Sequence, residues 1–261
     1  MKKVGIIGAG KIGGSLLLRL AESGGFDLGV SDIHPEQLRV FKDVGVRTTS
    51  SNHELAQWSD LIIVAVKPWD VAQVMQEMSP AFKGTEKAVT SVAAGVSIAR
   101  ISENLPEGTA VLRVMPNVCA SVGLGSAVVT ANEAGRDTLP TVMDIFRHVG
   151  DVLELPERLF DAATALHGSG PAYVALFADA LIQAGVREGI PRDVARRLVV
   201  GTIGGTAVLL KERSAHQVRD EVMTPGGTTA AAFVAMEKAG FVAAVYDGVE
   251  AATEQARGLG R

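Results

Sequence analysis

The chain has 261 residues, enough for two domains that each bury a core. Its formal net charge of −4 gives no electrostatic reason to expect nucleic acid as a partner. Cys119 is the only cysteine, so neither an internal disulfide nor a thiolate zinc cluster can form, and no metal is predicted.

The first residues combine Met1-Lys2-Lys3 with an apolar run, as the start of a secretory signal would. Lys11 ends that run after residues 4–10, which is too short for the apolar core of a signal peptide. The most apolar run elsewhere, residues 61–66, has the length of a strand and is far below a membrane span. We therefore expect a cytoplasmic protein with no membrane partner.

A dinucleotide-binding motif follows the first predicted strand, residues 4–7. Gly8-Ala9-Gly10-Lys11-Ile12-Gly13 stands between this apolar run and a helical pattern of leucines at positions 16, 17 and 20. In this setting the first glycine permits the turn, the second lets a pyrophosphate approach the backbone, and the third lets helix and strand pack closely. We expect this loop to bind NAD(P)H, with a purely structural glycine turn as the alternative.

Asp32 ends the second predicted strand, residues 28–31, and so occupies the position of a cofactor-selecting acid. A carboxylate there accepts hydrogen bonds from the adenosine ribose and repels the extra phosphate of NADPH. The sequence therefore favours NADH, although Arg39 in the next helix leaves NADPH open. Alternatively, Asp32 only begins the turn before Pro35, a residue suited to the first position of a helix.

Further apolar runs alternate with helical patterns, at residues 61–66, 88–92, 110–114, 127–130 and 152–155. Lys67-Pro68, Ala93-Ala94-Gly95 and Met115-Pro116-Asn117 follow three of these runs, where the carboxyl ends of open α/β sheets bind ligands. We predict a Rossmann-type, doubly wound parallel sheet over residues 1–156.

Residues 157–261 contain no convincing strand pattern and read as helices throughout. Gly201, Gly204 and Gly205 stand inside one predicted helix, where each costs about 1 kcal/mol relative to alanine if exposed. Small residues there favour the close approach of another backbone. We predict an all-helical dimerisation domain completed by a second copy of the chain, with an apolar monomeric bundle as the alternative.

Two glycine turns enter helices in this half, Gly168-Ser169-Gly170-Pro171 and Pro225-Gly226-Gly227-Thr228-Thr229. A helix N-terminus behind such a turn offers N–H groups and partial positive charge to a carboxylate or phosphate. The threonine hydroxyls add neutral hydrogen-bonding groups. We expect both turns to face one ligand, with a plain turn in which Thr228 or Thr229 caps the helix as the alternative.

The chain resembles pyrroline-5-carboxylate reductases in a series of motifs that occur in the same order. They are the glycine motif, Ala65-Val66-Lys67-Pro68, Val92-Ala93-Ala94-Gly95-Val96, Arg113-Val114-Met115-Pro116-Asn117 and the two glycine turns. The resemblance covers essentially the whole chain, and the last two motifs are specific to that family. It implies reduction of 1-pyrroline-5-carboxylate to L-proline with NAD(P)H, the final step of proline synthesis. It also implies a homo-oligomer, at least a dimer, that is built through the helical domain.

The resemblance also implies which residues bind. The cofactor contacts would be Gly8, Ala9, Gly10, Lys11, Ile12, Gly13, Asp32, Asn52, Ala65, Val66, Lys67, Pro68, Ala93, Gly95 and Asn117. The substrate contacts would be Thr224, Gly226, Gly227, Thr228 and Thr229, with Thr229 as the catalytic residue that hydrogen-bonds the ring nitrogen.

Three positions depart from the usual family residues. Val118-Cys119-Ala120 replaces Thr-Pro-Ala, His167 replaces a serine, and Thr224 replaces the serine before Pro225. We expect a structural role for His167 in its turn, since imine reduction does not need a histidine there, and proton donation is the alternative.

Two other functions stay open at this point. One is a related imine or hydroxyacid reductase of the same architecture. Oxidation of an alcohol requires a general base, and residues 170–185 contain no lysine or histidine, which argues against alcohol chemistry. The other is a non-catalytic, nucleotide-sensing relative.

Overall fold

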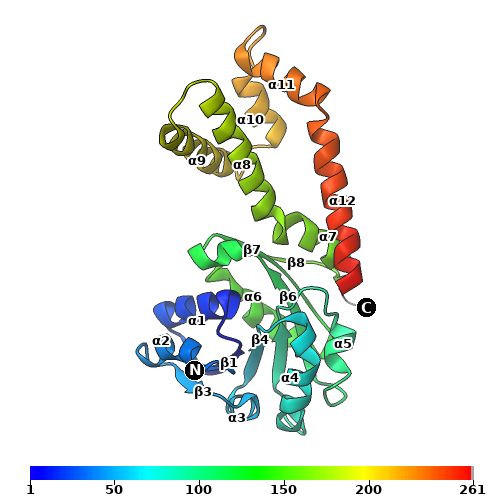
Figure 1. Cartoon of the computed structure of the whole chain (residues 1–261). Coiled ribbons are helices and arrows are strands. Elements are labelled where there is room, and N and C mark those ends of the chain that lie inside the picture. The colour runs from blue at the N-terminus through cyan, green and yellow to red at the C-terminus, as the bar shows by residue number, and fades with distance from the viewer. Residues whose placement is uncertain (260–261) are drawn as a thin grey trace. The chain divides into compact units, whose positions relative to one another are not determined.

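The computed structural model describes residues 1–259, which form two compact units (Figure 1). The first unit contains Met1–Ser169 together with the chain from Ala252 onward, and the second contains Gly170–Ala251.

Within the described residues, the first unit holds an eight-stranded sheet with the order β3-β2-β1-β4-β5-β6-β7-β8 (Figure 1). The strands are β1 Lys2–Ile7, β2 Phe26–Ser31, β3 Arg47–Thr49, β4 Leu61–Val64, β5 Ala88–Ser91, β6 Ala110–Pro116, β7 Gly125–Ala131 and β8 Gly150–Glu154. The strand order reverses between β1 and β4, which is the switch point where such sheets bind ligands. The predicted Rossmann-type sheet is confirmed.

One strand pair departs from the all-parallel expectation. β7 runs antiparallel to β6, with Leu112 opposite Ala131, whereas β8 runs parallel to β7. The link between β6 and β7 contains only the 3₁₀ turn Val118–Val122, and a parallel crossover needs a dozen or more residues. A link this short can only return the chain antiparallel.

Helices cover both faces of the sheet. In the first unit they are α1 Lys11–Ser23, α2 Arg39–Lys42, α3 Asn52–Trp58, α4 Val71–Met78, α5 Ile98–Ser102, α6 Leu139–Arg147 and α7 Phe160–Ala163. Side chains of α1 and α6 pack in one core and those of α3, α4 and α5 in another. Alternate residues of β4 enter opposite cores, Leu61 and Ile63 one core and Ile62 the other, as the two-residue period of a strand requires.

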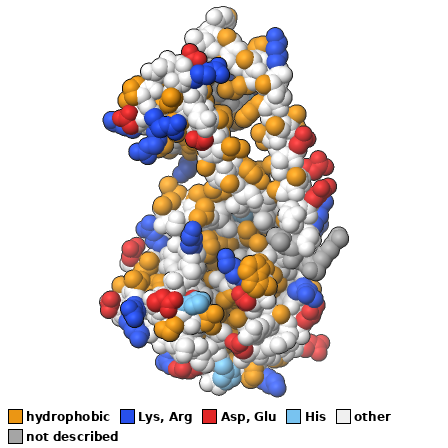
Figure 2. Space-filling model, in the orientation of Figure 1, with side chains coloured by type: hydrophobic (Ala, Val, Ile, Leu, Met, Phe, Trp, Pro, Cys, Tyr) orange, Lys and Arg blue, Asp and Glu red, His pale blue; other side chains and the backbone are white. Residues whose placement is uncertain are grey.

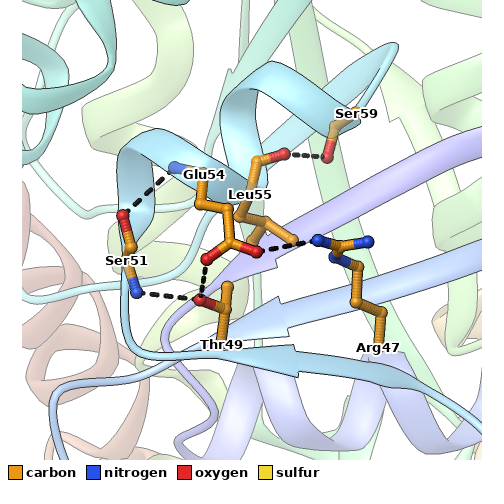
Figure 3. Close-up of polar contacts among 6 residues, drawn as sticks. All are labelled: Arg47, Thr49, Ser51, Glu54, Leu55 and Ser59. Carbon is orange, nitrogen blue, oxygen red and sulfur yellow. Dashed lines mark hydrogen bonds and ion pairs between the residues drawn. The ribbon is translucent and has the colours of Figure 1, made fainter.

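The edge strand β3, which the sequence analysis did not predict, is tied to α3 by polar contacts (Figure 3). Arg47 donates to one carboxylate oxygen of Glu54 over 2.7 Å, and the Thr49 hydroxyl donates to the other over 2.9 Å. The Ser51 hydroxyl accepts from the Glu54 N–H and caps the helix (Figure 3). The hydrogen bonds from Arg47 and Thr49 hold the pKa of Glu54 below its usual range. Together these contacts fix the first turn of α3, which begins at Asn52.

The second unit is helical, as predicted, and its described residues contain no strand. Its helices are α8 Gly170–Arg187, α9 Arg192–Leu209, α10 Ala215–Val222, α11 Thr228–Lys238 and the larger part of α12 Phe241–Leu259. A capping box begins α10, in which Ser214 and Gln217 each bond the other's backbone N–H.

Packing extends the first unit beyond residue 156, where the sequence analysis placed the domain boundary. Arg113 of β6 donates to Glu157 over 3.2 Å, and its guanidinium lies 4.7 Å from the centre of the Phe160 ring. These contacts bind the segment after residue 156 to the sheet. The division into residues 1–156 and 157–261 stays a prediction, and the compact units separate after Ser169.

The described helices include none that is by itself long and apolar enough to cross a membrane. Thr228–Lys238 and Phe241–Gly258 meet that test only as a pair, bent by 52° at the break between them, and by length and composition alone.

Candidate active site

A cleft of about 680 Å³ opens in the first unit at the carboxyl ends of the central strands. Gly8 and Ser31 line it where β1 and β2 end, and Ala65 and Ala93 line it just after β4 and β5. This is the expected position for a dinucleotide in a sheet of this order, and the volume suits a cofactor-sized ligand.

The glycine loop has the open geometry that a pyrophosphate needs. A Cβ atom built on Gly10 would meet no atom within 4 Å, so the backbone there is open to a ligand. At Gly13 a Cβ would collide with the Gly8 carbonyl oxygen. The helix can therefore pack this closely against the loop only because residue 13 is glycine. Helix α1 starts after Gly10 with no side-chain cap and no acidic residue in its first turn. Its first N–H groups are therefore left without a side-chain partner and suit an anion.

Asp32 directly follows β2 and contacts the glycine loop. Its Oδ2 accepts from the Ala9 N–H over 2.7 Å, and its Oδ1 accepts from the His34 N–H over 2.8 Å. The second bond begins the turn before Pro35, which is the first residue of a 3₁₀ turn, Pro35–Leu38. Asp32 also lines the cleft, so its place in the turn is compatible with a cofactor contact, which stays a prediction.

Most of the predicted cofactor residues line this cleft. They are Gly8, Gly10, Lys11, Ile12, Asp32, Asn52, Ala65, Val66, Lys67, Pro68 and Ala93. Ala9 lines an adjoining hollow on the other side of the loop, together with Gly14 and Ser15. Gly13, Gly95 and Asn117 do not line the cleft. The assignment of all these residues, inside the cleft or outside it, as cofactor contacts stays a prediction.

One wall of the cleft is polar, and of its residues only Asn52 and the neighbouring Asp32 were predicted from the sequence. Ser31 donates from its hydroxyl to Asn52 Oδ1 over 2.7 Å, and Asn52 Nδ2 donates to Glu77 Oε2 over 2.7 Å. Gln73 Nε2 donates to the other oxygen of Glu77 over 3.0 Å. The only sequence signal was the spacing of Gln73 and Glu77, which places both on one face of α4.

The second unit contains the predicted substrate residues at the start of α11. Thr224-Pro225-Gly226-Gly227 forms a β-turn closed by a 3.0 Å hydrogen bond from the Gly227 N–H to the Thr224 carbonyl. Gly226 has φ +71°, the left-handed value that the third position of a type II turn requires. This turn gathers Thr224, Gly226, Gly227, Thr228 and Thr229 at one helix N-terminus.

Neither threonine caps α11, which corrects one alternative of the sequence analysis. The helix begins at Thr228, its N-cap is Gly227, and no side chain makes the capping hydrogen bond. The turn places Gly227 at the cap position, so Thr228 and Thr229 already lie inside the helix. The first N–H groups of α11 therefore remain available to an anion, and the Thr229 hydroxyl is not used as a cap.

His167 lies in a π-helical turn, Thr164–Gly168, and its contacts are structural. Its Nε2 lies 3.0 Å from the Met115 carbonyl oxygen, which can only accept, so this nitrogen carries the proton. Its own backbone carbonyl accepts from Asn117 Nδ2 over 3.1 Å. Burial lowers the pKa of His167, which favours the neutral ring. These contacts support the structural role over proton donation.

Asn117 is likewise occupied within its own loop. Its Oδ1 accepts from the N–H groups of Cys119 and Ser126, both over 3.2 Å, and so shapes the 3₁₀ turn between β6 and β7. The Val118-Cys119-Ala120 departure lies in this turn, where Val118 is exposed.

Comparison with known proteins identifies the family. Residues 157–259 match the family model described as pyrroline-5-carboxylate reductase dimerisation. Residues 3–95 match the model described as NADP oxidoreductase, coenzyme F420-dependent. A pyrroline-5-carboxylate reductase from Synechocystis sp. is 38% identical over 99% of this chain and 98% of its own length. The chain belongs to the pyrroline-5-carboxylate reductase family.

Solved structures of this family have the same fold over their whole length. The pyrroline-5-carboxylate reductase of Coxiella burnetii matches with a TM-score of 0.93 at 31% identity, covering 99% of this chain and 98% of that one. The Plasmodium falciparum pyrroline carboxylate reductase, solved with NADP bound, matches with a TM-score of 0.88 at 33% identity, covering 100% and 98%. The predicted family and fold class are therefore confirmed.

Proposed function

We propose that this protein reduces 1-pyrroline-5-carboxylate to L-proline with NAD(P)H, the last step of proline synthesis. The observation that carries the proposal is the full-length likeness to pyrroline-5-carboxylate reductases in a chain with an open glycine-loop cleft. The protein is thus an oxidoreductase that acts on the carbon–nitrogen double bond of a cyclic imine.

The residues of the cleft fit a dinucleotide. Gly10 and the first N–H groups of α1 would hold the pyrophosphate, and Asp32 would accept from the adenosine ribose. Lys67 and Ala93 line the cleft at the ends of β4 and β5, beside the switch point. When bound, the nicotinamide supplies the hydride that the imine carbon receives. The protein mainly has to hold the reacting carbons close and aligned.

The substrate carboxylate would be held by the N-terminus of α11. The first N–H groups of this helix lack a side-chain cap, and its first turn contains no acidic residue. The hydroxyl of Thr229, a half-buried residue, would hydrogen-bond the ring nitrogen. Its neutrality suits a protonated imine, since a cation at this position would oppose the charge on the ring.

The active form is a homo-oligomer, at least a dimer, built through the second unit. Hydrophobic side chains lie on the surface of this unit in the single chain (Figure 2). Among them Leu176 is 72% exposed, Leu198 57% and Tyr246 71%. A Cβ atom on Gly204 would meet no atom within 4 Å, so no described backbone crosses this glycine. A second copy of the chain accounts for both features, and the match to the dimerisation model supports it.

Two finer assignments belong to this proposal. NADH is favoured over NADPH because Asp32 places a carboxylate at the adenosine end of the cleft. The cytoplasm is the proposed location, on the grounds of the short apolar runs in the sequence.

The test is cofactor oxidation, followed spectrophotometrically, with 1-pyrroline-5-carboxylate as substrate. Parallel reactions supply 2-hydroxyacids with NAD⁺ or NADP⁺, the direction that a hydroxyacid dehydrogenase would catalyse. Turnover of the imine without oxidation of hydroxyacids supports the proposal. The opposite pattern would assign the chain to alcohol chemistry, and binding of cofactor without any turnover would indicate a nucleotide-sensing relative.

A further inference from the structure

A continuous chain of hydrogen bonds runs along one wall of the cofactor cleft, from β2 through α3 to α4. Ser31 donates to Asn52, and Asn52 donates to Glu77, both over 2.7 Å. Gln73 closes the chain by donating to Glu77 over 3.0 Å. All four residues line the cleft. Ser31 directly precedes Asp32, so this wall lies beside the acid at the end of β2.

This chain fixes the orientation of the Asn52 amide. The Ser31 hydroxyl points its proton at the amide oxygen, and the Glu77 carboxylate can only accept, so the amide nitrogen must face Glu77. One N–H of this nitrogen is used by Glu77, and the described residues supply no hydrogen-bond acceptor for the other. Asn52 is therefore held with a donor available in the cleft, where a ribose or phosphate oxygen can accept.

The backbone of Asn52 is fixed independently of this chain. Asn52 is the first residue of α3, and Ser51 caps the helix by accepting from the Glu54 N–H over 3.2 Å (Figure 3). Arg47 and Thr49 hold the Glu54 side chain over the same turn (Figure 3). Since these contacts with β3 already fix the backbone of Asn52, the effect of Glu77 is limited to orienting the Asn52 side-chain amide.

Glu77 also changes the charge of the cleft. With His34 counted as neutral, the cleft is lined by two positive side chains, Lys11 and Lys67, and three negative ones, Asp32, Asp70 and Glu77. Without Glu77 the two signs would balance, and with it the lining is negative. Since Glu77 is connected through Asn52 to the residue before Asp32, its charge lies on the adenosine side. There it would oppose the 2′-phosphate that distinguishes NADPH from NADH.

We infer that Glu77 is a specificity-determining residue of the cofactor cleft, which orients the Asn52 amide and disfavours a cofactor that carries a 2′-phosphate. The inference rests on the proposed function only in taking NADH and NADPH as the ligands of the cleft. Asp32 and Glu77 then select against the phosphate from two different places, the turn after β2 and helix α4.

The test measures the dissociation constants of NADH and NADPH by isothermal titration calorimetry, without substrate. Glu77→Gln removes the charge with the least change of shape. We expect NADPH to bind roughly fivefold more tightly and NADH to change by less than about twofold. Glu103→Gln removes the same charge from an exposed site outside the cleft. Among the described residues Glu103 pairs only with Arg100, over 3.5 Å, and its replacement should leave the ratio of the two constants unchanged. Ser31→Ala, which frees the Asn52 amide but keeps all charges, should weaken both cofactors by a similar factor.

Glu77→Lys extends the series in case the neutral variant folds poorly, and it should shift the ratio further toward NADPH. The inference is overturned if Glu77→Gln moves the NADPH to NADH ratio no more than Glu103→Gln does, or if Glu77→Lys moves it toward NADH. Because the readout is binding, a protein that binds both cofactors but does not reduce 1-pyrroline-5-carboxylate contradicts the proposed function alone.

Discussion

The Asp32 carboxylate accepts a 2.7 Å hydrogen bond from the backbone N–H of Ala9, so the residue that directly follows β2 also holds the second residue of the glycine loop. Its other oxygen accepts from the His34 N–H over 2.8 Å. Cofactor choice and loop geometry therefore depend on the same side chain.

Replacing Asp32 with serine should move cofactor preference toward NADPH and also raise the KM for both cofactors. The preference changes because the negative charge is lost, and both KM values rise because Ala9 loses the acceptor that holds it. Steady-state kcat/KM with each cofactor measures the first effect, and the separate KM values measure the second. A wild-type enzyme with the higher kcat/KM for NADPH would show that Asp32 does not select NADH.

Introducing leucine at Gly204 should break the oligomer. The position is open in the single chain, so the added side chain costs little within one subunit but would collide with a partner backbone that crosses the glycine. Sedimentation at micromolar concentration measures the mass, with Glu22→Leu on the surface of α1 as a control for added apolar bulk. A fully active wild type that sediments as one chain of 27.2 kDa would contradict the dimer.

The stability of the folded chain should fall as the pH is lowered through the range just below 6.5, and His167 should contribute to this fall. Burial lowers the pKa of His167 from its ordinary value of 6.5, so the unfolded chain takes up a proton before the folded one does. The contribution of His167 to the free energy of unfolding is fully present above pH 6.5. It is lost as the pH falls toward the lowered pKa that His167 has in the folded chain. Urea unfolding of wild type and His167→Gln measures it: the variant should show a shallower decline.

His216→Gln is the control for this measurement, because His216 is an exposed histidine of α10. It should keep the wild-type decline. Equal pH dependence of wild type and His167→Gln would mean that burial of His167 has no influence on stability.

The parts of the fold that the sequence predicted depend on local signals. Apolar runs ending at Gly8 or Asp32 identify buried strands, and Pro35, Pro68 and Pro171 each stand in the first turn of the helices they were assigned to. The direction of β7 was not predicted, since an apolar run does not encode which way it pairs. The short strand β3 was missed because its stability comes from Arg47, Thr49 and the helix beside it.

The candidate site likewise contains residues that could be predicted from the sequence and residues that could not. The glycine motif carries its own geometry, so its cleft-lining residues could be named from sequence. The wall from Ser31 to Glu77 joins residues that are far apart in the sequence and become neighbours only when β2 and α4 take their places in the sheet. A threonine cap for α11 stayed open as an alternative because the left-handed φ of Gly226, which sets where the helix begins, cannot be read from the residue alone.

Thr229→Ala should lower kcat/KM for 1-pyrroline-5-carboxylate by roughly tenfold or more, about the 1.4 kcal/mol of one modest hydrogen bond. Thr229→Ser should recover much of this loss because serine keeps the hydroxyl. NADH binding should change little in either variant, since the cleft that would hold it lies in the first unit. Since Thr229 does not cap α11, the alanine variant should keep nearly all of its thermal stability. A variant with wild-type kcat/KM would remove Thr229 from the mechanism.

Product identification tests the central claim most directly. The purified protein is incubated with 1-pyrroline-5-carboxylate and NADH or NADPH, and L-proline is quantified by chiral chromatography and mass spectrometry alongside the cofactor consumed. We expect L-proline to form mole for mole with cofactor oxidation and to be absent when protein or cofactor is omitted. Intact binding of cofactor with no proline formed, under conditions in which a known pyrroline-5-carboxylate reductase turns over, would contradict the account.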